Sequence, residues 1–193
     1  MKTLIGLALA LTLLQACNHS SEKKIVESPK PTKDTASFFP VTSYILGQIT
    51  EINNKGVNPL RYITIKGHRD SSFLKMEELP DAFSEFMHPV IDSVNLISLF
   101  TEKRFMDQTV DAFTFTYDPI GVLPDSMVLQ HWDVYVEPKT GKLRRIYMVK
   151  NFGETKTRQL TWQGDKWCMI VDILNKPDGT SSVEKEVKIT WDF

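Results

Sequence analysis

The sequence predicts an α+β domain in which N-terminal helices pack on one face of a curved antiparallel sheet. Three observations lead to this fold class. Apolar residues recur at roughly helical spacing up to about residue 110, and from Asp111 onward they alternate with polar residues, as in a half-buried strand. The later runs are separated by a few residues each, and connections this short join only antiparallel neighbours. We therefore expect residues 38–193 to form a single α+β domain that ends in a six-strand meander.

The domain is expected to start with a helix followed by a strand. Apolar residues from Phe39 to Ile52 recur at helical spacing, and Gly56 offers a stop in the left-handed conformation. Residues 60–67, LRYITIKG, are dense in β-forming side chains and predict a strand. The polar residues 68–70 that follow are expected to form a solvated turn.

Short helices joined by prolines should come next. A helix is expected to begin near Leu79, because Pro80 suits a first helical turn better than a helix interior. Pro89 either ends that helix or begins another, which would place apolar side chains between Val90 and Phe105 against the core.

Alternation within the six later runs predicts which side chains face the core. The last run also carries Lys185 in its apolar phase, and its other face is polar, so one side of the sheet should be wet. All four tryptophans fall in the inward phase, which favours an aromatic core over a platform of exposed rings that stacks sugars. The expected inward residues are Phe113, Phe115, Tyr117, Trp132, Val134, Val136, Leu160, Trp162, Trp167, Met169, Val171, Ile173, Val183, Val187, Ile189, Trp191 and Phe193.

The first residues have the pattern of an export signal. After Lys2, an apolar run of eleven residues extends from Leu4 to Leu14, which is too short to span a bilayer but typical of a secretory signal peptide. Leu14, Ala16 and Cys17 resemble the lipobox of bacterial lipoprotein precursors. The resemblance implies that residues 1–16 are removed as a signal peptide and that Cys17 is acylated, which holds the protein at the membrane. Because residue 18 is not the aspartate of inner-membrane retention, the resemblance favours the outer membrane, with the periplasmic and surface faces both open.

Composition limits the domain organisation and the partners. Residues 17–37 are rich in Ser, Lys, Glu and Pro, which predicts a flexible tether between the lipid and the domain. Without the signal peptide, 22 basic residues face 24 acidic ones, so we expect no nucleic-acid partner. Acylation of Cys17 would leave Cys168 without a disulfide partner, and Cys168 is expected to be a buried small side chain.

No motif assigns catalysis to the domain. The four histidines are far apart in the sequence, and there is neither a phosphate-binding glycine loop nor a Gly-x-Ser-x-Gly turn, so we predict no catalytic residue, no metal ligand and no cofactor. The remaining candidates are His131, Asp133 and Tyr135, which lie two residues apart on one expected strand and project together from its wet face. Asp172 or Asp192 would join them if the sheet curls, although such residues are also ordinary on a solvent face.

One hairpin resembles a known exported family. Residues 132–150 are similar to the hairpin of PepSY-like domains in Val134, Val136, Glu137, Thr140 and Gly141. The resemblance implies a non-enzymatic periplasmic module that binds or restrains another molecule. The sequence thus predicts a lipid-anchored envelope protein that binds a protein or a small ligand. A hydrolase of cell-wall or glycan substrates and a structural component of an envelope assembly are the alternatives.

Overall fold

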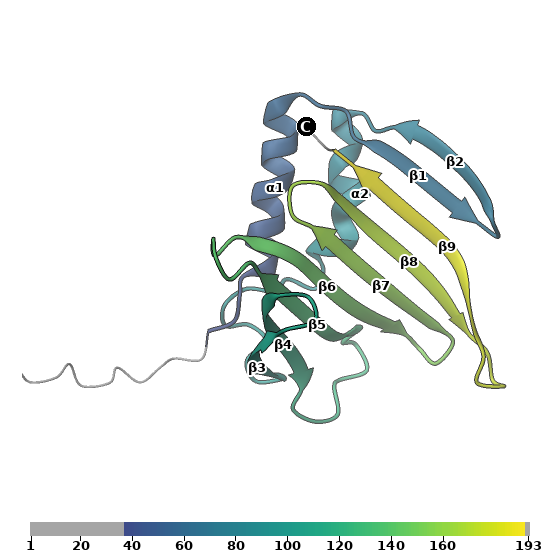
Figure 1. Cartoon of the computed structure of the whole chain (residues 1–193). Coiled ribbons are helices and arrows are strands. Elements are labelled where there is room, and N and C mark those ends of the chain that lie inside the picture. The colour runs from purple at the N-terminus through teal and green to yellow at the C-terminus, as the bar shows by residue number, and fades with distance from the viewer. Residues whose placement is uncertain (1–36, 192–193) are drawn as a thin grey trace, which may run out of the picture. The chain divides into compact units, whose positions relative to one another are not determined.

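The computed structural model describes residues 37–191, which form a nine-stranded antiparallel sheet with two short helices (Figure 1). The strand order is β2-β1-β9-β8-β7-β6-β5-β4-β3. The predictions for the signal peptide, Cys17, the tether and Asp192 lie outside the described residues. The elements are α1 (Val41–Lys55), β1 (Leu60–Ile65), β2 (His68–Phe73), the 3-10 helix η1 (Met76–Glu78), α2 (Leu79–Met87), β3 (Phe100–Asp107), β4 (Ala112–Pro119), β5 (Leu129–Val136), β6 (Leu143–Phe152), β7 (Lys156–Gln163), β8 (Trp167–Asn175) and β9 (Ser181–Thr190).

The predicted α+β fold class is wrong, because the protein is mainly β. Its two helices hold 15 and 9 residues, and the sheet supplies most of the regular structure. The six strand-like runs form β4 to β9, each hydrogen-bonded to its neighbour in sequence. Of the two alternatives for Pro89, the structure supports the end of α2 and not the start of another helix: a turn-rich segment leads into β3, which pairs with β4 at one edge of the sheet.

The opposite edge holds a second strand that the sequence did not predict. Residues 68–70 lie in β2, which pairs with β1 in a hairpin, and are not part of a solvated turn. Every residue of β2 is exposed, and five of the eight residues of β3 are exposed or half-buried polar groups, among them Glu102, Lys103 and Arg104. An edge strand without a buried face lacks the alternation by which strands are recognised, and charged side chains are typical of such edges.

Both predicted helix boundaries are supported. Gly56 ends α1 with a φ of 63°, a left-handed conformation that glycine adopts without steric cost. Leu79 begins α2, with Pro80 in its first turn. Phe83 and Phe86 of α2 contact the Trp162 ring of β7, with centroids 5.3 Å apart in both pairs. The helices therefore contribute side chains to the same core as the sheet.

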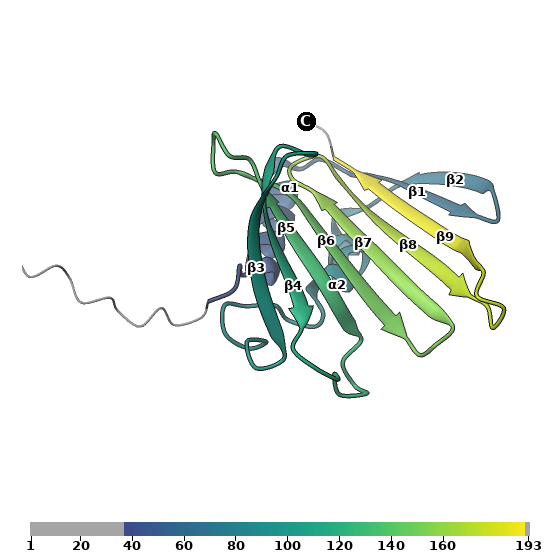
Figure 2. The same cartoon turned by 60° about the horizontal axis from the view of Figure 1, so that its bottom comes forward.

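The core is aromatic, and it lies on the side of the sheet where Figure 2 shows both helices behind the strands. Trp132, Trp162 and Trp191 are buried there, and the rings of Tyr117 and Trp132 stack 4.5 Å apart. The prediction for β8 has the wrong phase: Cys168 and Ile170 face the core, and the expected Trp167, Met169, Val171 and Ile173 face the other side of the sheet. We call the other side of the sheet, which no described element covers in Figure 2, the open face.

The phase error in β8 has a physical cause. Apolar side chains occupy both faces of this strand, so alternation cannot decide which face is inward. Register decides it, because Cys168 pairs with Trp162 on β7 and with Ile189 on β9, both of which are buried. Trp167 is therefore half-buried on the open face, where the Lys188 ammonium lies 5.1 Å from its ring centroid.

Candidate functional site

The three predicted ligand-binding residues lie together on the open face of β5. His131 Nε2 is 3.1 Å from Asp133 Oδ2, and the Tyr135 hydroxyl donates to the same oxygen over 3.3 Å. Their alternation with Trp132 and Val134, which are buried in the core, fixes this orientation.

Strand β4 completes a polar cluster around His131. Asp118 Oδ1 lies 2.9 Å from His131 Nδ1, and the Thr116 hydroxyl donates to Asp133 over 2.6 Å. Lys103 on β3 pairs with Asp118 over 2.9 Å. Hydrogen bonding to Asp133 and Asp118 outweighs burial and raises the pKa of His131. The imidazole is thus held between two carboxylates that stabilise its protonated form.

The pKa values of the two carboxylates in this cluster are shifted in the opposite direction, downward. The hydrogen bond from Lys103 lowers the pKa of Asp118 against the effect of burial. Burial would raise the pKa of Asp133, but hydrogen bonds from His131 and Thr116 outweigh it and lower the pKa. Acid catalysis near neutral pH needs a carboxyl group whose pKa is raised, so this cluster has the character of a satisfied ion network.

Asp172 does not join the open-face cluster. It pairs in register with Arg158 on β7, whose neighbour in phase, Leu160, is buried in the core. Asp172 therefore lies on the helix side of the sheet, three strands away from β5. The expectation that it lies beside His131 is wrong, because the phase of β8 was assigned to the wrong face.

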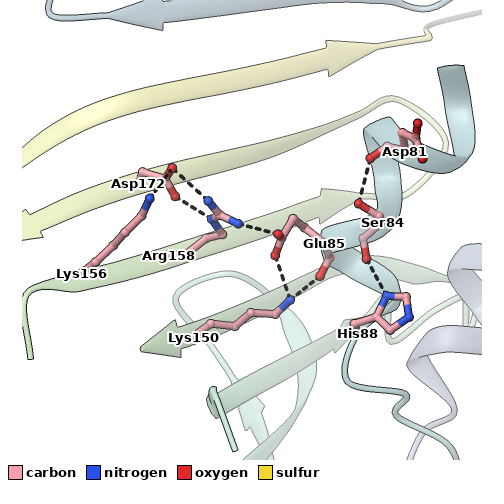
Figure 3. A network of polar contacts seen from close by, with 8 residues as sticks. All are labelled: Asp81, Ser84, Glu85, His88, Lys150, Lys156, Arg158 and Asp172. Atoms are coloured by element: carbon pink, nitrogen blue, oxygen red, sulfur yellow. Dashed lines mark hydrogen bonds and ion pairs between the residues drawn. The ribbon is translucent and has the colours of Figure 1, made fainter. Parts of the chain in front are cut away.

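Asp172 belongs to a second polar network, between the sheet and α2 (Figure 3). Arg158 donates from Nε and Nη2 to the two Asp172 oxygens, over 2.6 and 3.0 Å. Its Nη1 lies 2.6 Å from Glu85 Oε1 on α2, so one guanidinium joins two carboxylates. Lys150 pairs with Glu85 Oε2 over 3.2 Å and donates to the Glu85 carbonyl, while Lys156 pairs with Asp172 over 3.2 Å.

This helix-side network consists of three cations facing two carboxylates. Burial would raise the pKa values of Glu85 and Asp172, but in each case the hydrogen bond from Arg158 and the neighbouring positive charges outweigh it and lower the pKa. Lys150 is only 2% exposed, and burial lowers its pKa although Glu85 opposes the shift. The carboxylates are thus ionised and fully engaged, and neither is poised to accept or donate a proton.

A pocket of about 280 Å³ opens beside this network, between α2 and strands β1, β7, β8 and β9. Strand register orders its floor into rows across the sheet. Ile63, Val187 and Ile170 form one row of directly paired apolar residues. Arg61 lies one row to one side, paired with Ile189, and Lys185 lies one row to the other, paired with Asp172. The pocket is lined by Arg61, Ile63, Asp81, Ala82, Glu85, Arg158, Ile170, Asp172, Lys185, Val187 and Ile189.

Sequence reasoning missed this pocket, although the signal was present. Lys150, Arg158 and Lys185 each stand in the same phase as the buried apolar side chains of their strands, and β6, β7 and β9 lie within one four-strand stretch of the sheet. Charged residues in a core phase indicate a buried ion network or a lined cavity, because burying an unpaired charge is costly. Only Lys185 stood out from the sequence alone, as an interruption of the apolar face of β9.

Residues 37–191 contain one cysteine and three histidines. Cys168 is buried, as expected, and burial raises the pKa of its thiol. No group of three or more His, Cys, Asp and Glu side chains in this part of the chain is arranged to hold a metal ion. Within the same residues, neither helix has the length and apolar character needed to span a bilayer.

Comparison with models of known protein families found no match, and searches of curated proteins and of solved structures also found none. The site is therefore described by its own geometry.

Proposed function

We propose that this protein is a lipid-anchored, non-enzymatic binding module of a bacterial cell envelope, held by an acylated Cys17, and that it binds a small molecule. The observation that carries the binding proposal is the pocket beside α2, whose apolar floor lies between charged side chains. Small-molecule sites are typically concave and combine apolar surface with placed polar groups. This pocket has five apolar and six charged lining residues, which suits a ligand that is itself charged. The lipobox resemblance of Leu14, Ala16 and Cys17 supports the anchor.

The electrostatics favour binding over hydrolysis of cell-wall or glycan substrates. A glycoside hydrolase pairs a carboxyl group of raised pKa with a second carboxylate. In the two polar networks described above, the pKa values of Asp118, Asp133, Glu85 and Asp172 are all lowered, and each group is engaged by a cation. Such groups position a ligand or stabilise the fold, and they do not supply a proton at neutral pH.

The anchor is tested by intact-mass spectrometry of the full chain extracted from membranes with detergent. The wild-type protein should begin at an acylated Cys17, and the Cys17→Ala variant should lack both the cleavage and the added mass. An unmodified wild-type N-terminus in the soluble fraction would overturn the anchored part of the proposal.

The pocket is tested by native mass spectrometry of the full chain for small molecules that purify with it. Ala82 lines the pocket from α2 and is half-buried, so Ala82→Met should fill the space and abolish the bound mass. Ser84→Met is the matched control, because Ser84 is exposed on the same helix and does not line the pocket. A bound mass that survives Ala82→Met would place the ligand elsewhere and contradict the proposal.

A further inference from the structure

We infer that the pocket beside α2 binds a small organic dianion whose two acidic groups lie at opposite ends of an apolar body. This inference rests on the proposed function and adds the chemical class of the ligand. Three features support it: the pocket carboxylates are already paired or solvated, two cationic side chains are not paired with a carboxylate, and an apolar row lies between these two cations.

The pocket carboxylates are either paired or solvated. Glu85 is engaged by Lys150 and Arg158, and Asp172 is engaged by Lys156 and Arg158. Asp81 is exposed at the N-terminal end of α2, where water and salt screen its charge. None of the three is a buried anion in need of a cationic ligand.

Two cationic side chains of the pocket have no carboxylate partner among the described residues. Within residues 37–191, neither Arg61 nor Lys185 makes an ion pair, although both side chains are partly buried. Arg61 donates from Nη2 to the Ser72 hydroxyl over 3.1 Å, but its Nε is buried without a hydrogen-bond acceptor. A buried donor without an acceptor is uncommon in folded proteins and costs free energy, so Arg61 is short of an acceptor that a ligand oxygen would supply.

The charge around the pocket also favours an anionic ligand. The helix-side network places three cations, Lys150, Lys156 and Arg158, against only two carboxylates. Lys185 is the direct cross-strand neighbour of Asp172 and thus lies at the side of the pocket where this surplus is found. Positive charge in a partly desolvated pocket attracts anions more strongly than the same charge in water.

The two unpaired cations stand at opposite ends of the floor. Arg61 pairs with Ile189 and Ile65 pairs with Lys185, so the two rows are four residues apart along β9, or roughly 14 Å. Between them lies the apolar row of Ile63, Val187 and Ile170. An apolar chain with an acidic group at each end matches this separation along the floor. A single acidic group would engage both cations only if the two side chains folded toward each other over the apolar row.

The pocket size limits the ligand. Its volume of about 280 Å³ lies just below the range of roughly 300 to 1,000 Å³ found for drug-sized ligands. A medium-chain dicarboxylate is of suitable size, and a dianion with phosphate ends would offer the same chemistry.

The test is isothermal titration of the full chain in detergent with three probes of the same chain length. These are nonanedioate, nonanoate and 1,9-diaminononane, which carry two negative charges, one negative charge and two positive charges. We expect nonanedioate to bind at least about tenfold more tightly than nonanoate, and the diamine to bind more weakly than either. A phosphate-ended analogue, nonane-1,9-diyl bisphosphate, distinguishes the two kinds of acidic group.

Three variants assign the effect to residues. Arg61→Met and Lys185→Met remove one charge each and keep a long apolar side chain, so each should weaken nonanedioate binding by about tenfold and leave nonanoate less affected. Lys188→Met is the matched control, because Lys188 lies on β9 but on the open face, and its affinity should be unchanged. Thermal unfolding of each variant verifies that it is folded.

The outcomes separate the two proposals. Equal or tighter binding of nonanoate or the diamine, blocked by Ala82→Met, would overturn the dianion inference and leave the proposed binding function standing. Full affinity of both Arg61→Met and Lys185→Met for nonanedioate would overturn the inference as well. If no probe, including the bisphosphate, binds at about millimolar concentration, the inference is wrong, and the co-purification experiment alone decides the proposed function.

Discussion

Replacing Glu85 by Gln should destabilise the protein much more than replacing Lys150 by Met, although the two side chains form one ion pair. Lys150 is 2% exposed, so its ammonium group depends on Glu85 for a charged partner. Breaking a fully buried pair typically costs about 3–5 kcal/mol because one charge is left uncompensated. The Glu85 side chain is 35% exposed and Lys150 keeps its bond to the Glu85 carbonyl, so we expect a loss of about 2–3 kcal/mol for Glu85→Gln.

Replacing Lys150 instead leaves no buried charge without a partner. After Lys150→Met, Glu85 still pairs with Arg158, and the methionine side chain fills similar space among its neighbours. Removing a buried lysine also removes the cost of its desolvation, so the net loss should stay below about 1 kcal/mol.

Urea unfolding, followed by the fluorescence of the buried tryptophans, measures both free energies. For a domain of this length, the loss expected for Glu85→Gln corresponds to a fall in melting temperature of about 5–10 °C. Glu184→Gln is the control, because Glu184 is exposed on β9 and has no ion pair among the described residues. A Lys150→Met variant as unstable as Glu85→Gln would refute the reasoning, since the lysine charge would then contribute net stability.

Three further predictions follow from single positions. The pKa of His131 is raised above its usual 6.5, so the stability that its protonated form contributes is full below pH 6.5 and is lost as the pH rises through the raised value. His131→Gln should therefore reduce the urea-unfolding free energy more at about pH 5.5 than at about pH 8.5, and equal losses would contradict the ion network. Trp167→Phe should remove most of the acrylamide-quenchable fluorescence, because the other three tryptophans are at most 2% exposed. Trp191→Phe is the comparison and should leave the quenchable fraction in place. Unchanged quenching in Trp167→Phe would place Trp167 in the core. Gly56→Ala should destabilise the protein by about 1 kcal/mol, because the φ of Gly56 is 63°. Gly47 is exposed inside α1 with no neighbour near an added Cβ, so Gly47→Ala should stabilise the protein by about 0.5–1 kcal/mol. Thermal unfolding measures both changes, and a loss of stability at both positions would argue against the assigned end of α1.

Sequence patterns predicted those elements that bury one clear face. Gly56 and Pro80 marked helix ends by backbone chemistry that holds in any tertiary context, and β4, β7 and β9 carry their large apolar side chains in a single phase. The predicted fold class failed at β2 and β3, whose side chains are mostly exposed. An edge strand is specified by the strand beside it, and that information is not in its own residues.

The sequence predicted the grouping of the open-face cluster but not the pocket beside α2, and the ligand-binding role expected for the cluster stays a prediction. His131, Asp133 and Tyr135 were placed together because spacing of two residues on one strand is a local property. The helix-side network depends on the cross-strand register of β6 to β9 and on the position of Glu85 on α2, which are both tertiary facts. Where apolar residues occupy both faces of a strand, as in β8, register alone decides which side chains enter a pocket.

The pairing of β1 with β9 carries a consequence for the order in which the molecule assembles. Strands β4 to β9 each pair with a sequence neighbour, but β1 joins the sheet only through a strand more than a hundred residues later, with Leu60 opposite Thr190. An isolated two-stranded hairpin is only marginally stable in water, so the β1–β2 hairpin becomes stable only after β9 has been synthesised and has paired with β1. Arg61 lies on β1 and Lys185 lies on β9, so the two cations come together only when these strands pair. A ligand held between them would bind only chains whose folding is complete, and would shift their folding equilibrium toward the native state.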